Sequence, residues 1–353
     1  MRFSKTTLTT LSGSLSLLLI SVYYYIEGFN VAVSDIGLYR LWSYDLLSHL
    51  EPQQLPGLPA LLAFFRFISF NVISDIILMV SIVYFSWLIL IAYTLKILDT
   101  IAPETKDLGV LLISFFPFFG VSMIAYPAAD IIAHALFFCT IFYSLKFEKT
   151  KFLIFFIMST FIHKVLWPFL ILLAVLNYFD KKIDLSQLIY IFIPIFSYYL
   201  LIYFSLSEIS LGIFSNFSTN LNLTSNFTYP LNGIFENFYE NSLISVVKGI
   251  LLLTAFISSV LLIIYAIRSR NLLLIALTFP IMILGMFVNE FTATSLIRHC
   301  KVLVIPFCVW LSIEQKSFLV FLNNKYFYIT LLILLILSQL VFGWYQVFYE
   351  TMR

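Results

Sequence analysis

Apolar runs of roughly bilayer-spanning length recur from one end of this 353-residue chain to the other. An α-helix of about 20 residues crosses a bilayer core that is about 30 Å thick. Hydrophobic residues make up 61% of the chain and charged residues only 11%, which leaves no room for a sizeable soluble domain. We therefore predict an all-α fold in which residues 1–353 form a single integral membrane domain, a polytopic transmembrane bundle of about 11 helices.

The predicted spans are residues 8–27, 72–95, 108–125, 128–145, 152–163, 165–179, 188–206, 244–267, 271–288, 299–314 and 326–346. The pieces 152–163 and 165–179 are short for spans, so two half-helices that meet near His163 and Lys164 are an open alternative. The first run follows two basic residues as a signal peptide would, but no small-residue cleavage site follows it. We expect it to be a retained first helix.

The positions of lysine and arginine predict which side each loop faces, because short cytoplasmic loops are enriched in these residues. With a cytoplasmic N-terminus, the inner side holds 13 of the 20 basic residues: Arg2, Lys5, Lys96, Lys106, Lys146, Lys149, Lys151, Lys181, Lys182, Arg268, Arg270, Lys316 and Lys325. The opposite orientation would place only the other 7 inside. The chain is therefore predicted to be multi-pass with its N-terminus in the cytoplasm. Its high Phe, Ile and Asn content is typical of an AT-rich bacterial genome and favours a bacterial inner (plasma) membrane.

Two loops on the predicted outer side are long, namely residues 28–71 and 207–243. Within the first loop, residues 36–50 and 57–70 have helical spacing with aromatic and leucine faces. Segments of this kind usually lie in the plane of the membrane interface. We expect interfacial amphipathic helices in the first outer loop.

The sequence disfavours nucleic-acid binding and metal binding by cysteine. The 20 basic and 18 acidic residues are thinly spread without a basic stripe, so we expect no nucleic acid partner. The three cysteines, Cys139, Cys300 and Cys308, lie in or beside apolar runs without the spacing of metal ligands. We expect them to pack as small apolar residues.

Eight ionisable residues fall near one level of the predicted bundle, at the outer ends of its helices. They are Asp35, Asp130, His163, Lys164, Glu290, Arg298, His299 and Lys301. Ionisable groups at membrane depth are costly, so those that are present mark candidate functional sites.

Each of these residues also has a purely structural interpretation. Asp35 could cap an interfacial helix, and Asp130 could hydrogen-bond to His134, which lies four residues further along the same helix face. Lys164 could extend to lipid headgroups. The basic residues of 298–301 could anchor a helix end to phospholipid phosphates. Because three basic or potentially basic groups at an outer edge oppose the charge rule, a bound anion is the preferred interpretation there.

A carboxylate and several basic groups at one membrane level suit a reaction on a lipid-linked phosphate. The basic groups would stabilise charge that develops on the leaving phosphate. The carboxylate would accept a proton from an attacking sugar hydroxyl, or bind a divalent metal that does part of that work. The expected partners are the membrane, a polyprenyl-linked sugar donor and a lipid or glycan acceptor, and a divalent metal is the one cofactor left open.

Several short motifs resemble GT-C-type membrane glycosyltransferases. These are Ser34-Asp35-Ile-Gly-Leu-Tyr39-Arg40 with Leu55-Pro56-Gly57-Leu58-Pro59, Phe116-Pro117-Phe118-Phe119 with Tyr126-Pro127-Ala-Ala-Asp130, and Arg298-His-Cys-Lys301-Val-Leu-Val-Ile-Pro306. The order of the motifs agrees over roughly the whole chain. The resemblance implies a catalytic Asp35, with substrate-binding roles for Tyr39, Arg40, Asp130, Arg298, His299 and Lys301. From their place at an outer helix junction, His163 and Lys164 are also expected to bind substrate.

A second resemblance leaves the kind of transfer open. Phe161-Ile-His163-Lys164, with Asp35 and Pro56-Gly57, also resembles EpsG/Wzy-like polysaccharide polymerases, which share the lipid-linked chemistry of the GT-C enzymes. We therefore expect transfer of a sugar from a polyprenyl phosphate in cell-envelope polysaccharide or glycolipid synthesis, with repeat-unit polymerisation as the first alternative. A transporter or flippase of lipid-linked sugars is the second, less favoured because transport sites tend to lie near the bilayer midplane.

Overall fold

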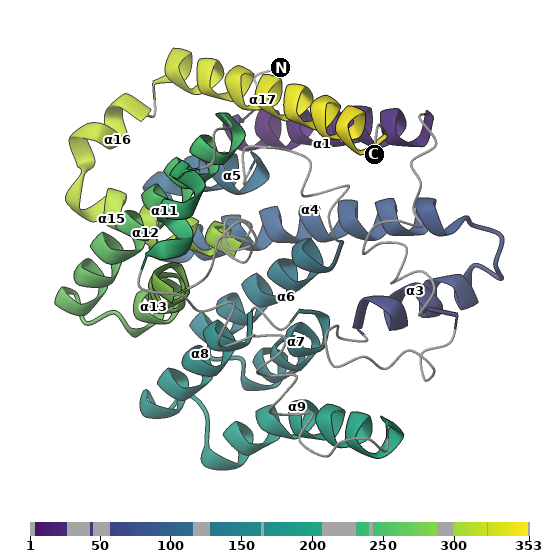
Figure 1. Ribbon diagram of the computed structural model, residues 1–353. Helices are drawn as coiled ribbons and strands as arrows, with labels where there is room; N and C mark the ends of the chain where they lie inside the picture. Colours follow the sequence, from purple (N-terminus) through teal and green to yellow (C-terminus); the bar gives the residue numbers. More distant parts are fainter. Residues whose placement is uncertain are drawn as a thin grey trace. The chain divides into compact units, whose positions relative to one another are not determined.

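The computed structural model describes residues 4–26, 43–44, 57–115, 128–163, 166–206, 231–239, 243–287, 299–322 and 324–351. Every regular element in these ranges is a helix, which confirms the all-α class (Figure 1). The chain divides into two compact units. Unit 1 comprises Met1–His49, Pro56–His163 and Cys308–Arg353, and unit 2 comprises Leu50–Leu55 and Lys164–Phe307.

Unit 1 is organised around the long helix α4. Its helices are α1 (Lys5–Ile26), α3 (Gly57–Ile68), α4 (Asp75–Ile101), η1 (Pro103–Thr105), α5 (Lys106–Phe115), α6 (Ala128–Leu145), α7 (Lys149–Ile162), α16 (Lys316–Leu322) and α17 (Lys325–Thr351). Helix α4 packs against α3, α5 and α6, and α6 packs in turn against α7. Trp87, Leu90, Thr94 and Ile97 of α4 are all fully buried. Their spacing of three and four residues places them on one helix face, which is the face that packs inward.

Helices α6 and α7 form a hairpin that is closed by three residues. Phe147 has a left-handed backbone conformation (φ 58°). The amides of Phe147 and Glu148 donate hydrogen bonds to the carbonyl oxygens of Ser144 and Tyr143, which ends α6 in the manner of a C-cap motif. A connection this short joins antiparallel helices. The first turn of α6 and the last turn of α7 therefore lie at the same end of the hairpin.

A tight turn also joins α3 to α4. Phe70 (φ 52°) and Asn71 (φ 60°) both have left-handed conformations, and the Asn71 amide donates a hydrogen bond to the Arg66 carbonyl oxygen. Asp75 then opens α4, where the helix dipole favours an acidic residue. The turn brings the last turn of α3 beside the first turn of α4.

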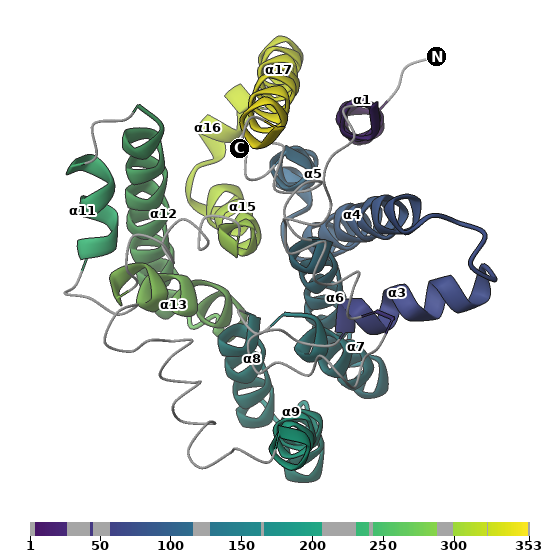
Figure 2. The same cartoon turned by 45° about the vertical axis from the view of Figure 1, so that its right-hand side comes forward.

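The N-terminal and C-terminal helices pack together within unit 1. Helix α1 lies beside α17, and both contact α5 (Figure 1 and Figure 2). Leu111 and Phe115 of α5 form a buried cluster with Tyr328, Leu332 and Leu335 of α17. The α17 residues are spaced by four and three, as one buried helix face requires.

Polar contacts join α1 to α17 along this apolar packing. The hydroxyls of Thr9 and Tyr328 are 2.5 Å apart, and the Ser16 hydroxyl donates to Gln339 Oε1 at 2.8 Å. All four side chains are buried. Paired polar groups are needed at such positions, because a buried hydroxyl or amide without a partner is costly.

Unit 2 consists of the helices α8 (Trp167–Phe179), α9 (Leu185–Leu206), α11 (Asn232–Tyr239), α12 (Leu243–Arg268), α13 (Leu272–Phe287) and η5 (Cys300–Leu303). Helix α13 packs against α8, α11, α12 and η5, and α8 packs against α9. Helix α15 (Val304–Glu314) begins in unit 2 and ends in unit 1. The short α12–α13 turn contains Arg270 with a left-handed φ of 52°.

Each predicted span overlaps a helix of the structure, although the ends differ. Helix α4 occupies Asp75–Ile101 where we predicted 72–95, because the left-handed turn at Phe70 and Asn71 delays its start. The short pieces 152–163 and 165–179 are separate helices, α7 and α8. Helices α11 and α16, with 8 and 7 residues, lie in stretches that we predicted as loops. The predicted helix 57–70 is confirmed as α3, whereas nearly all of residues 36–50 lie outside the described part of the chain.

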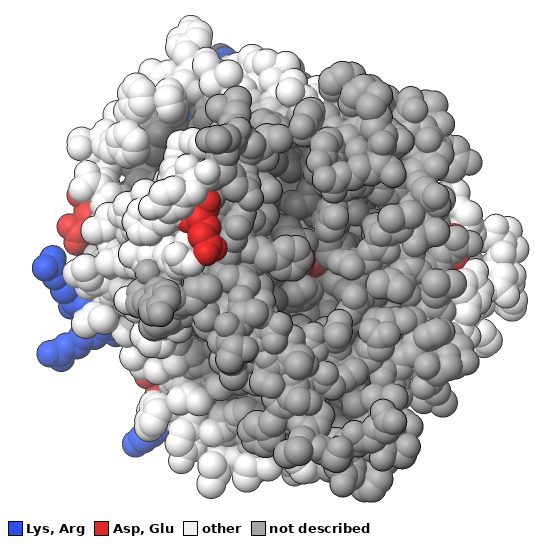
Figure 3. Space-filling view, viewed as in Figure 1, with Lys and Arg blue, Asp and Glu red and all other residues white. Residues whose placement is uncertain are grey.

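Two described helices are long and apolar enough to cross a membrane, namely Ile77–Ile101 within α4 and Gly249–Arg268 within α12. Shorter apolar helices cover Gly57–Ile68, Ala129–Leu145, Trp167–Phe179, Leu272–Met286 and Lys325–Val341. In Figure 3 the described surface is mostly uncharged, with a few Lys, Arg, Asp and Glu side chains. The three cysteines are buried thiols, as expected of packing residues.

Candidate functional site

Asp130 and His163 face each other at one end of the α6–α7 hairpin. Asp130 lies in the first turn of α6, where the helix dipole favours a negative charge, and His163 caps the C-terminus of α7. His163 Nε2 lies 3.0 Å from Asp130 Oδ1. The Asp130 side chain is 4% exposed and the His163 side chain 19% exposed. The imidazole is therefore the more accessible member of this pair.

His134 lies one turn further along α6 and is fully buried. Its Nδ1 is 2.6 Å from the backbone carbonyl oxygen of Asp130. Because a carbonyl oxygen only accepts hydrogen bonds, this geometry assigns a proton to His134 Nδ1. A hydrogen bond between these two residues is thus present, but it uses the Asp130 backbone, and the pairing of their side chains stays a prediction. A further bond, from the Ser159 hydroxyl to the Ala133 carbonyl oxygen at 3.3 Å, joins α7 to α6 beside the histidine.

The burial of Asp130 sets the electrostatics of the site. A carboxylate that leaves water loses several kcal/mol of hydration free energy unless a cation or hydrogen-bond donors compensate it. The imidazole of His163 and the N-terminal dipole of α6 both supply compensation here. An imidazole held by a carboxylate in this way is oriented to bind an anion or to exchange a proton with a ligand.

The start of α3 contacts the end of α7 immediately before His163. A Cβ atom on Gly57 would lie 2.5 Å from the Phe161 carbonyl oxygen and 2.7 Å from Ile162 Cδ1. Only glycine allows the two backbones to approach so closely. This contact joins two motifs that lie far apart in the sequence. It brings Gly57 of the first motif against Phe161 of the second.

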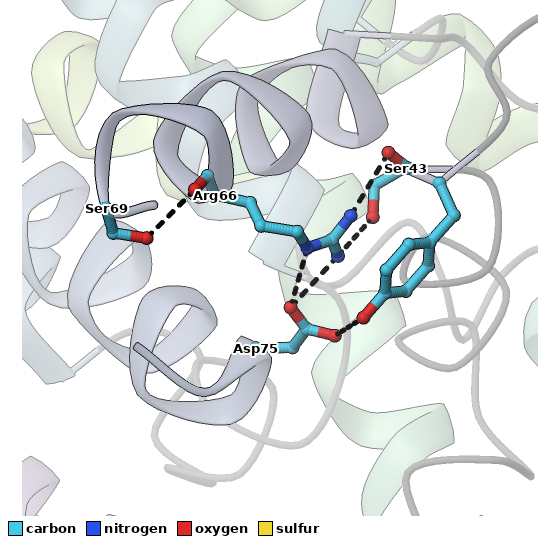
Figure 4. Close-up of polar contacts among 5 residues, drawn as sticks. Ser43, Arg66, Ser69 and Asp75 are labelled. Atoms are coloured by element: carbon cyan, nitrogen blue, oxygen red, sulfur yellow. Dashed lines mark hydrogen bonds and ion pairs between the residues drawn. The ribbon is translucent and has the colours of Figure 1, made fainter. Parts of the chain in front are cut away.

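A second polar cluster joins α3 to α4, and it centres on Arg66 (Figure 4). Arg66 Nη2 and Nε donate to Asp75 Oδ1 at 2.9 and 3.0 Å. Its Nη2 and Nη1 also donate to the hydroxyl and the carbonyl oxygen of Ser43, at 2.7 and 3.2 Å. The Tyr44 hydroxyl donates to Asp75 Oδ2 at 3.0 Å, and the guanidinium carbon lies 3.6 Å from the centroid of the Tyr44 ring. The guanidinium therefore ties residues 43–44 of the first long loop to both helices.

Arg66 is not among the site residues that we predicted from the sequence. Arg66 is only 8% exposed. The available signal was its place as the lone charge in the apolar run Leu-Leu-Ala-Phe-Phe-Arg-Phe-Ile of α3. A charge in such a run marks either a functional site or a buried ion pair. The geometry assigns Arg66 to the second class, with Asp75 as the partner.

The predicted site residues fall into three groups. Five of them lie outside the described residues: Asp35, Tyr39, Arg40, Lys164 and Arg298. Asp130 and His163 are brought together as a pair. His299 and Lys301 belong to unit 2, where His299 precedes η5 and Lys301 lies within it. Both are buried, which is unusual for a lysine and is consistent with a role beyond lipid anchoring.

The Asp130–His163 pair also has the chemistry of a partial metal site, since a carboxylate oxygen and an imidazole nitrogen are both ligand types for divalent metals. Comparisons with protein-family models, with curated proteins and with solved structures found no match to this chain.

Proposed function

We propose that this protein is a multi-pass membrane glycosyltransferase that uses a polyprenyl phosphate sugar donor at the extracytoplasmic face. The observation that carries the proposal is the Asp130–His163 pair, a buried carboxylate and an accessible imidazole at the same end of two antiparallel apolar helices. At the other end, the connector and the start of α7 contain Lys146, Lys149 and Lys151.

The dimensions of the hairpin support this placement. Asp130 and Lys146 are separated by about 24 Å along α6, since an α-helix rises about 1.5 Å per residue. A bilayer core is about 30 Å thick, so a helix of this length fits between the two interfaces. The lysine-rich end would face the cytoplasm by the charge rule. The Asp130–His163 pair would then lie at the outer interface, where the sequence analysis expected it.

Exposed apolar side chains on α12 support a lipid environment. Ile250, Ile257, Leu261 and Ile264 of this helix are each more than 40% exposed. Their spacing of seven, four and three residues places them on one helix face, and an exposed apolar face marks a membrane or protein interface. In lipid the exposure of these side chains has no free-energy cost, because they do not contact water.

The reaction follows from the charges at the outer interface. The acceptor hydroxyl attacks the anomeric carbon of the donor sugar, the bond between that carbon and the phosphate oxygen breaks, and polyprenyl phosphate leaves with the electron pair. Asp35 accepts the proton of the hydroxyl, a role that comes from the motif resemblance. His163, held by Asp130, stabilises the negative charge on the leaving phosphate.

The other predicted residues have binding roles in this scheme. Tyr39 and Arg40 accompany Asp35 in the first loop, and the Gly57–Phe161 contact anchors the end of that loop next to His163. Lys164 follows His163 directly in the sequence. Arg298, His299 and Lys301 supply further positive charge for a phosphate or pyrophosphate.

Repeat-unit polymerisation is a second candidate function, and the same geometry favours it. The segment Phe161-Ile-His163-Lys164, which resembles EpsG-type polymerases, contains both the paired His163 and the backbone that contacts Gly57. A polymerase would join oligosaccharide blocks from polyprenyl pyrophosphate. The two reactions differ in leaving group and in product length.

Deletion of the gene in its source organism, followed by complementation, tests the proposal. We expect surface glycan to be lost in the deletion strain, restored by the wild-type protein and not restored by Asp35→Asn or His163→Gln variants present at wild-type levels. A single shifted glycan band would support transfer of one sugar, and a lost ladder would support polymerisation. Unchanged surface glycan in the deletion strain would contradict both functions.

A further inference from the structure

The lysine-rich end of the hairpin has a defined architecture of its own. Four aromatic rings from three helices meet there: Tyr93 of α4, Phe142 and Tyr143 of α6, and Phe155 of α7. The hydroxyls of Tyr93 and Tyr143 are 2.9 Å apart. The rings of Tyr143 and Phe155 are stacked, with centroids 5.3 Å apart and planes inclined by 9°. We call these four residues the aromatic platform.

Three lysines lie over the aromatic platform. Lys96 Nζ and Lys146 Nζ are each 5.7 Å from the centroid of the Phe142 ring. Lys151 Nζ is 5.2 Å from the centroid of the Tyr143 ring. These distances are within the range of cation–π interaction, about 6 Å. Ammonium groups from α4, the hairpin connector and α7 therefore all contact one aromatic cluster.

The positive charge of this group is only partly neutralised. Lys151 forms an ion pair with Glu148 at 2.6 Å. Within the described part of the chain, neither Lys96 nor Lys146 has a carboxylate partner. Three ammonium groups against one carboxylate leave an excess of two positive charges. The lysines are exposed, so an anion can reach them from outside the protein.

Apolar side chains continue from the lysines along both flanking helices. On α4, Phe85 and Ile89 are 63% and 42% exposed, and with Lys96 their spacing of four and seven residues forms one stripe. On α7, Ile154 and Met158 are 49% and 45% exposed and follow Lys151 at spacings of three and four. Each stripe therefore has a lysine at one end and exposed apolar side chains along the rest of the helix face. This pattern complements an amphiphile with an anionic head and hydrocarbon chains.

We propose that Lys96, Lys146 and Lys151, held over the aromatic platform, form a binding site for the headgroup of an anionic phospholipid. The phosphate diester lies between the ammonium groups, and the acyl chains lie along the exposed stripes of α4 and α7. The proposal requires that the chain is embedded in a membrane, but it does not depend on the glycosyl transfer at the opposite end of the hairpin. A soluble phosphate would satisfy the charge and leave the apolar stripes without a role.

Lys106 provides a matched control because it is a neighbouring lysine whose charge is already neutralised. Its Nζ lies 2.7 Å from Asp99 Oδ1, and the hydrogen bond and charge of Asp99 raise the pKa of Lys106 above its ordinary value. Lys106 follows the C-terminal end of α4, the helix that contains Lys96. Replacing Lys106 removes one positive charge near the proposed site without removing a member of it.

The test is a thermal unfolding measurement on the full chain in neutral detergent, with added phosphatidylglycerol or with phosphatidylcholine of the same acyl chains. We expect phosphatidylglycerol to raise Tm by several degrees more than phosphatidylcholine does. In a Lys96→Gln/Lys146→Gln/Lys151→Gln variant this difference should vanish and the apparent affinity for phosphatidylglycerol should fall about tenfold or more. The Lys106→Gln variant should behave like the wild type.

Several results would overturn the lipid site. Equal stabilisation by the two lipids would do so, as would a triple variant that keeps the difference. Stabilisation by inorganic phosphate alone that equals that of phosphatidylglycerol would assign the site to a soluble anion. Photo-crosslinking of the wild-type protein with a photoreactive phosphatidylglycerol gives a check without any substitution. Labels should map to residues 85–96 or 146–158, and labels found only elsewhere would contradict the proposal.

Discussion

His163 Nε2 lies 3.0 Å from Asp130 Oδ1, and the two partners are unequally buried, with side-chain exposures of 19% and 4%. The pair joins the last turn of α7 to the first turn of α6 through the α6–α7 hairpin. Because water reaches the imidazole more readily than the carboxylate, loss of one partner is not equivalent to loss of the other. This asymmetry can be measured.

Replacement of His163 should destabilise the protein more than replacement of Asp130. His163→Ala removes the imidazole from a buried carboxylate, which we expect to cost about 3 kcal/mol of unfolding free energy. Asp130→Asn removes the buried charge and leaves a more accessible histidine, at a cost of about 1 kcal/mol. Thermal unfolding in detergent measures both variants. A larger loss for Asp130→Asn would contradict the assigned burial of the pair.

A double-mutant cycle measures the interaction itself. The Asp130→Asn/His163→Ala variant should be more stable than the sum of the two single losses implies, with a coupling of about 1–3 kcal/mol. Additive losses would mean that the two side chains do not interact in the folded protein.

Arg66→Lys should behave as a disruptive substitution although it conserves charge. The guanidinium donates to Asp75 Oδ1 and to two oxygens of Ser43, and a single ammonium group cannot reproduce this planar arrangement. We expect a loss of about 2 kcal/mol for Arg66→Lys and about 3 kcal/mol for Arg66→Ala. Lys106→Arg, at an exposed pair with Asp99, should leave Tm unchanged. Equal Tm values for wild type and Arg66→Lys would show that the planar arrangement of guanidinium donors is not needed.

Gly57→Ala should separate α3 from α7 and lower transfer activity. The added Cβ would meet the Phe161 carbonyl oxygen at 2.5 Å and its carbonyl carbon at 2.8 Å, and backbone atoms cannot move aside without shifting a helix. We expect a loss of about 2 kcal/mol in stability. Gly249→Ala is the control, because the nearest atoms to its Cβ belong to the rotatable ring of Phe238, at 2.9–3.1 Å. Similar effects of both substitutions would argue against a special contact at Gly57.

Gln339→Leu should be neutral or stabilising even though it removes a buried hydrogen bond. Gln339 Nε2 is buried without a hydrogen-bond partner among the described residues. The single proton of the Ser16 hydroxyl can turn from Gln339 Oε1 to the Gly13 carbonyl oxygen, 2.9 Å away, when the glutamine is replaced. Removing an unpaired buried amide offsets the lost bond. Tyr328→Phe, which leaves the buried Thr9 hydroxyl without this partner, should lower stability by about 1 kcal/mol. Thermal unfolding measures the stability of both variants. A strongly destabilised Gln339→Leu would show that the Gln339 amide contributes net stability.

The helices could be predicted because their signal is local. An apolar run of sufficient length has few folded solutions other than a helix, whether lipid or other helices surround it. The amphipathic α3 was predicted from the spacing of its apolar residues. The short helices α11 and α16 were missed because stretches of 8 and 7 residues give no clear periodic signal.

The two polar sites differ in how far they could be predicted. Alternating helices and loops placed Asp130 and His163 at one level, which follows from the topology of a hairpin. The Arg66–Asp75 ion pair depends on the turn between α3 and α4, in which Phe70 and Asn71 have positive φ angles. Residues other than glycine rarely adopt this conformation, so sequence patterns do not indicate it. Nor did the sequence indicate that Gly57 contacts Phe161, since that contact joins segments about 100 residues apart.

The most direct test of the central claim is sugar transfer by the purified protein in sealed proteoliposomes, with a polyprenyl phosphate sugar as donor and the lipid-extractable glycan as readout. We expect wild type to transfer sugar. The His163→Gln variant, shown to be folded by a cooperative unfolding transition, should lose about a hundredfold or more in kcat/KM. Restricting the donor to one leaflet should support transfer only from the leaflet that adjoins the Asp130–His163 end of the hairpin. Equal transfer by wild type and His163→Gln, or transfer only from the leaflet at the lysine-rich end, would rule out an active site at the Asp130–His163 pair.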